Sequence, residues 1–203
     1  ERSGRVVYLR PRPLAAAEVE AFVSAYSPTD PAPLPAVLLE ACRQREVAAD
    51  GAPRYLPLLI RLAIRLRGIA PDIRTRGELY DAACRQLLAR PAAASVSMDQ
   101  VGELCVRSFF TTGSRTVVPR DGEELFFKLL EVGMLVATRR NRADGRELEA
   151  RFFHDSIQSY LTAYGLSRDE SLRWTCLAEA AGAQRFSASA ADAVPELLEM
   201  LRT

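Results

Sequence analysis

The chain has 203 residues and a formal net charge of +1, which is enough length for one large domain or two small ones. Nothing in a charge balance this close to neutral calls for nucleic acid or a membrane surface as a partner. No apolar run reaches the length of a membrane span and no signal-peptide pattern opens the chain, so we expect a cytoplasmic protein.

Residues 5–10 have the composition of a short β-strand, which Pro11 and Pro13 would end. The next strand pattern comes only at residue 134, and a lone strand cannot satisfy its backbone hydrogen bonds. The chain also begins without Met. We therefore expect residues 1–13 to be a terminal strand and linker that belong to a sheet encoded upstream.

Residues 14–94 show helical apolar spacing and predict a helical domain. After a first helix ending near Tyr26, prolines mark an extended link before helices near residues 36–47 and 57–67. Pro57 suits the first turn of the second of these, because an N–H there would have no intrahelical partner. Thr75 and Glu78 then predict a capping box at the start of a helix that Pro91 ends.

The segment 91–95 is a candidate linker, and we place a domain boundary at its end. Beyond it, capping boxes at Ser97 and Gln100 and at Asp121 and Glu124 predict two helices, the second stopped by Gly133. Strands at 134–138 and 149–153 follow, joined by a charged turn over 139–146. Two helices and a two-stranded hairpin predict a winged-helix domain over residues 95–166.

After the hairpin, Asp155 is a candidate N-cap with Gln158 as its capping-box partner. Ile157, Tyr160, Leu161 and Tyr164 give that helix an apolar face. A further helix opens at Asp169 and a last one covers residues 191–201. Residues 167–203 are thus the expected start of a second helical domain, and the predicted fold class is mainly α with one small β-hairpin.

The four cysteines, Cys42, Cys84, Cys105 and Cys176, lie far apart and each falls in an apolar helical pattern. This arrangement favours reduced core cysteines over disulfides or a metal site, and no metal is expected.

Enzymatic motifs are missing from the sequence. A P-loop needs a glycine-rich turn that ends in lysine, but Lys128, the only lysine, lies inside a predicted helix. His154, Asp155 and Ser156 are consecutive, and we expect consecutive residues not to converge as a nucleophilic triad must. The chain is therefore not expected to be an enzyme on its own.

Three motifs, taken in order, resemble a known family. They are residues 55–63 (YLPLLIRLA), residues 75–80 (TRGELY) and residues 151–163 (RFFHDSIQSYLTA). Together they resemble the helical lid and winged helix that follow the nucleotide-binding core of NACHT-type STAND NTPases. The arginine-rich composition is typical of GC-rich coding, so a bacterial source is expected.

The resemblance implies two ligand contacts. His154 matches the family's histidine at the base of the winged helix, which contacts the β-phosphate of bound ADP. Pro57 matches the lid proline that packs on the adenine, and Pro53 is the competing candidate. A histidine can donate a hydrogen bond to a phosphate oxygen, more strongly when protonated, and a rigid apolar ring suits the face of a purine.

The function that the resemblance implies is switching. The chain would close over ADP and open on exchange for ATP, so that the protein forms a homo-oligomer in signal transduction. The nucleotide would be bound mainly by an upstream P-loop domain, and sensor repeats would follow downstream.

Two alternatives stay open: a helical protein-interaction scaffold without a nucleotide role, and a winged-helix DNA-binding regulator. Against DNA, the helix before the hairpin carries Glu123, Glu124 and Glu131 beside Lys128, and carboxylates repel phosphates. Arginines in the charged turn could still touch a DNA backbone.

Overall fold

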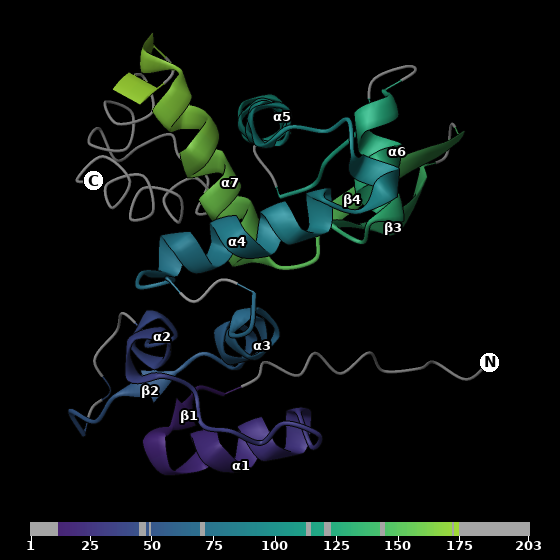
Figure 1. Ribbon diagram of the computed structural model, residues 1–203. Coiled ribbons are helices and arrows are strands. Elements are labelled where there is room, and N and C mark those ends of the chain that lie inside the picture. Colours follow the sequence, from purple (N-terminus) through teal and green to yellow (C-terminus); the bar gives the residue numbers. More distant parts are fainter. Residues whose placement is uncertain are drawn as a thin grey trace. The chain divides into compact units, whose positions relative to one another are not determined.

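The computed structural model describes residues 12–44, 48, 50–69, 72–112, 115–119, 123–142, 145–171 and 173–174. The chain divides into two compact units, Glu1–Ala82 and Ala83–Thr203 (Figure 1). It is mainly helical with two small antiparallel sheets, so the predicted fold class is confirmed. The predicted strand at 5–10, the helix at 191–201 and Cys176 lie outside the described residues.

The first unit is built around a buried helix. Its elements are β1 (Leu14–Ala15), α1 (Ala16–Tyr26), α2 (Ala36–Ala41), β2 (Arg54–Tyr55), α3 (Pro57–Leu66) and the start of α4 (Arg76–Leu88). Both α1 and α2 contact α3, whose Leu59, Ile60 and Ala63 are fully buried. The bounds of α3 agree with the helix predicted at 57–67, whereas α2 ends at Ala41, well before the predicted Val47.

The expectation that no strand lies between residue 10 and residue 134 is wrong. Strand β1 pairs antiparallel with β2, with Leu14 opposite Tyr55. Residues 42–44 also pair with β2, because the Leu56 N–H donates to the Cys42 carbonyl at 3.0 Å and the Gln44 N–H donates to the Arg54 carbonyl at 2.6 Å. Strands of two residues have no periodicity for sequence analysis to detect.

The second unit holds the rest of α4, a 3-10 turn η1 (Pro91–Ala93), α5 (Met98–Thr112), α6 (Glu124–Glu131), β3 (Leu135–Arg142), β4 (Gly145–Phe152) and α7 (Asp155–Arg168). The predicted linker at 91–95 is packed instead. Ala93 is fully buried, and the Lys128 ammonium on α6 donates to the Ser95 hydroxyl at 2.7 Å. The division between the units accordingly falls within α4, upstream of the predicted boundary.

Strand β4 lies at the centre of the hairpin sheet. On one side it pairs with β3 from Leu135 opposite Phe152 to the tip, so both strands extend into the predicted charged turn. On the other side Val117 and Ala150 exchange backbone hydrogen bonds of 2.8 and 3.0 Å. Along the chain, helix α5 is thus followed by the bridging residue Val117, helix α6, the β3–β4 hairpin and helix α7.

Helices α5 and α7 cross in close contact and touch through backbone (Figure 1). Gly102 and Gly165 face each other so closely that a Cβ added at Gly165 would meet the Gly102 carbonyl oxygen at 2.5 Å. The Tyr164 hydroxyl bonds to the Asp99 carboxylate at 3.0 Å. This bond joins the start of α5 to the late part of α7, beside the glycine contact.

Two predicted capping boxes are confirmed. Glu78 accepts from the Thr75 N–H at 2.8 Å while Thr75 accepts from the Glu78 N–H at 3.2 Å, and Ser97 and Gln100 repeat both bonds. Helix α6 instead begins after Glu123, which makes no side-chain cap, and Asp121 lies outside the described residues. Gly133 ends α6 with φ +76, as predicted.

Candidate functional site

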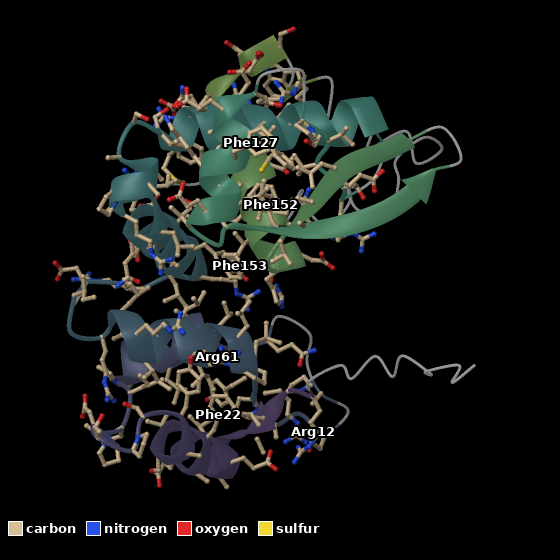
Figure 2. All side chains as sticks on the ribbon, turned by 90° about the vertical axis from the view of Figure 1, so that its right-hand side faces the viewer. Arg12, Phe22, Arg61, Phe127, Phe152 and Phe153 are labelled. Carbon is tan, nitrogen blue, oxygen red and sulfur yellow. The ribbon has the colours of Figure 1, made fainter. Side chains whose placement is uncertain are left out.

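His154 lies in the connection between β4 and α7. The base of the hairpin closes one residue earlier, where the Phe153 N–H donates to the Met134 carbonyl at 3.1 Å. Figure 2 shows Phe152 and Phe153 in succession at this end of the hairpin. The His154 carbonyl then accepts from the N–H groups of Ile157 and Gln158 and starts α7. Strand β4 is therefore joined to helix α7 by a direct turn that contains His154, in the order that the sequence predicts.

The N-cap of α7 is His154, and the predicted cap at Asp155 is wrong. His154 has extended backbone, and its Nδ1 accepts from the Ser156 N–H at 3.1 Å. Asp155 is the first residue of the helix proper. Gln158, the predicted capping partner, is 1% exposed, and neither its amide oxygen nor its amide nitrogen has a hydrogen-bond partner among the described residues. The imidazole takes over a role that sequence rules assign to Ser, Thr, Asp or Asn.

The cap determines which imidazole nitrogen carries the proton. A backbone N–H can only donate, so Nδ1 of His154 must be an unprotonated acceptor. The neutral ring then carries its proton on Nε2. The pKa of His154 is lowered, chiefly by desolvation; the Asp155 carboxylate opposes this change and the Arg115 guanidinium adds to it. At neutral pH the residue therefore offers one N–H donor, on Nε2.

Arg115 ties the start of α7 to the segment that follows α5. Its guanidinium donates to the Asp155 carbonyl at 2.9 Å and approaches the Asp155 carboxylate at 3.8 Å. The Ser159 hydroxyl donates to the same carbonyl at 3.2 Å. Sequence analysis missed Arg115 because it lies 40 residues upstream and no local motif links it to the helix start.

His154, Asp155 and Ser156 converge only in part. The Ser156 hydroxyl lies 2.6 Å from Nδ1 of His154. The same nitrogen also accepts the Ser156 backbone N–H, and the Asp155 carboxylate is turned to Arg115. A triad needs its carboxylate on the imidazole. The contact is thus part of the helix cap.

Pro57 is the first residue of α3, directly after the N-cap Leu56. It is half-buried, and so is Pro53 just before β2. The missing N–H of Pro57 removes a donor that would have no partner in the helix, as the sequence suggests. Pro57 and Pro53 belong to the first unit and His154 to the second, and each is positioned by contacts within its own unit.

The cysteines described by the structure are structural. Cys42, Cys84 and Cys105 are free and buried, as predicted. Burial raises the pKa of the Cys42 thiol to about 12 and that of Cys105 well above its usual value, so both stay protonated. Within the described ranges, no three His, Cys, Asp or Glu side chains gather as a metal site would require. No helix in those ranges is both long and apolar enough to cross a membrane.

The sequence matches no known protein-family model, and no curated protein shows significant similarity to it.

Proposed function

We propose that this chain is the helical lid and winged-helix portion of a NACHT-type STAND signalling NTPase, and that His154 donates a hydrogen bond from Nε2 to the β-phosphate of ADP. The observation that carries the proposal is the cap of α7. It fixes the imidazole in the tautomer whose free nitrogen is a donor, at the start of a helix of 14 residues.

The position of His154 suits a phosphate oxygen for a second reason. The N-terminus of a helix carries a partial positive charge that favours anions. The Asp155 carboxylate lies at the same end and is offset by the nearby Arg115 guanidinium. The neutral ring can donate from Nε2 to a phosphate oxygen while Nδ1 keeps the bond that holds the ring, whereas protonating Nδ1 would break that bond.

The arrangement around the hairpin supports the winged-helix part of the proposal. Strand β4 has β3 on one side and the short Val117 bridge on the other, with α6 directly before the hairpin. A winged helix pairs a short extended segment with the second strand of its wing, and we take the Val117 bridge as the counterpart of that segment.

In the proposed mechanism, a separate P-loop domain binds the nucleotide and this chain completes the site. Pro57, fixed at the start of α3, would pack on the adenine, and His154 would hold the β-phosphate. Loss of these contacts on exchange for ATP would free the lid and permit oligomerisation. Cytoplasmic signal transduction is the setting that this mechanism implies.

The test is a His154→Ala substitution in the protein that carries the P-loop domain. We expect the purified variant to retain less ADP and to oligomerise more readily, as shown by nucleotide extraction and size-exclusion chromatography. A Walker A motif is expected in the coding sequence upstream of this chain. Absence of that motif, or an unchanged ADP content in the variant, would contradict the proposal.

A further inference from the structure

Helix α3 presents two arginines on its solvent side. Leu59, Ile60, Leu62, Ala63, Ile64 and Leu66 are all buried, whereas Arg61 and Arg65 are exposed. Residues four apart in a helix lie next to each other on one face, with their Cβ atoms roughly 6 Å apart. The two guanidinium groups therefore form a single patch of positive charge.

Aromatic rings from α1 hold one of these arginines in place. The Arg61 Cζ lies 4.9 Å from the centroid of the Tyr26 ring, and Tyr26 stacks on Phe22 with centroids 6.2 Å apart and planes at 5°. Figure 2 shows Phe22 and Arg61 on these neighbouring helices. A hydrogen bond from Arg61 lowers the pKa of the Tyr26 phenol, with Arg65 adding to the effect. The contact orders the guanidinium before any partner arrives.

The two arginines differ from most others in the first unit. Arg12, Arg43, Arg54 and Arg67 each pair with a carboxylate. Among the described residues, no carboxylate pairs with Arg61 or Arg65, and both arginines interact with the Tyr26 side chain. The patch thus keeps two unneutralised cations beside two half-buried rings.

We propose that Phe22, Tyr26, Arg61 and Arg65, here named the α1–α3 basic face, dock an acidic segment of another protein. Arginine and tyrosine are the residues most enriched at the centres of protein interfaces, where an ordered guanidinium can pair bidentately with a carboxylate. Carboxylates on the partner would neutralise the two cations, and its apolar atoms would cover the rings. The surface does not depend on nucleotide binding by His154.

Charge complementarity favours a protein over other anions. Nucleic-acid binding uses many phosphate contacts, and this face offers two free cations on a chain of net charge +1. A free inorganic anion would be weakly held, because salt screens exposed charges. A protein segment can bury the whole patch at once and so keep dissolved salt away from the two arginine charges.

The test is the binding of a fluorescein-labelled octaglutamate peptide to the full chain at low ionic strength, followed by fluorescence anisotropy. Arg61→Gln/Arg65→Gln should weaken binding by roughly tenfold or more. Arg65→Gln alone, which leaves the Arg61 contact with Tyr26 intact, should show a smaller loss. Arg74→Gln is the matched control, because Arg74 is exposed in the same unit, is not part of the α1–α3 basic face, and loses one positive charge in the change.

The proposal stands if the peptide binds more tightly than an octaserine control and only the face variants weaken it, with unchanged circular dichroism. It is overturned if the wild type does not distinguish the two peptides, or if Arg74→Gln loses as much affinity as Arg65→Gln. It is also overturned if single-stranded oligothymidylate binds more tightly and depends on the same arginines, since the occupant would then be nucleic acid.

Discussion

At the scale of single residues, His154 couples a protonation state to a helix start. Its Nδ1 caps α7, and its pKa is lowered in the folded chain. A lowered pKa means that the unfolded chain binds the proton first as pH falls. The stabilisation is therefore complete above the ordinary histidine pKa of about 6.5 and is lost as pH falls from there through the lower folded value.

We predict that His154→Asn reduces the pH dependence of unfolding between neutral and mildly acidic pH. Asparagine can cap the helix but does not titrate. The measurement is urea unfolding of both proteins at several pH values, in which carboxylate titration is common to the two. An identical loss of stability in wild type and variant on acidification would contradict the role of Nδ1.

Gln158 gives a second prediction at this scale. Its side-chain amide is buried and has no hydrogen-bond partner in the part of the chain that the structure describes, and an unsatisfied buried polar group is destabilising. Gln158→Leu should therefore raise the free energy of unfolding by about 1 kcal/mol. Thr162→Val is the control, because the buried Thr162 hydroxyl donates to the Gln158 backbone carbonyl at 2.9 Å. Loss of this hydrogen bond should not raise the free energy of unfolding. Destabilisation by Gln158→Leu would show that the amide is satisfied in solution.

At the scale of elements, the sequence predicted what local chemistry determines. The capping boxes at Thr75 and Ser97 and the glycine stop at Gly133 are encoded within a few residues, and they were predicted correctly. The pairing of β1 with β2 was missed, because two-residue strands are defined by partners some 40 residues away. The cap of α7 was misassigned because the position of the imidazole depends on where β4 ends.

The crossing of α5 and α7 gives a prediction for these elements. A Cβ on Gly165 would meet the Gly102 carbonyl carbon at 2.7 Å and the Val106 Cγ2 at 2.8 Å, and backbone cannot yield without separating the helices. Gly165→Ala should destabilise the fold by about 1–3 kcal/mol in chemical unfolding.

Gly77→Ala is the matched control for that crossing. Gly77 also lies in a helix, but a Cβ added there would have the Thr75 hydroxyl as its nearest neighbour, at 3.9 Å. Alanine should be neutral or slightly stabilising there, because it favours the helix. Similar losses for the two variants would show that the close crossing does not set the stability of the second unit.

At the scale of the whole molecule, Pro57 lies in the first compact unit and His154 in the second. The family resemblance identified His154 and Pro57 as candidates, but it could not reveal Arg115, which meets α7 only through the fold. The tautomer of His154 was equally hidden, because it follows from a hydrogen bond to Ser156.

The charge distribution of the molecule argues against DNA as the partner of the hairpin. On α6 the Lys128 ammonium is engaged by Glu124 at 2.7 Å, and Glu131 is exposed. We predict that duplex DNA binds weakly and without sequence preference. A salt titration of duplex binding checks this, and submicromolar affinity that falls steeply with salt would favour the DNA-binding regulator instead.

The central claim is that His154 both caps α7 and donates Nε2–H to a phosphate, and one measurement separates these roles. In the protein that carries the P-loop domain, His154→Asn keeps a capping side chain but removes the imidazole donor. The ADP content of the purified variant should fall well below that of wild type while its unfolding midpoint at neutral pH stays close to the wild-type value. Full ADP retention by the variant would contradict the account.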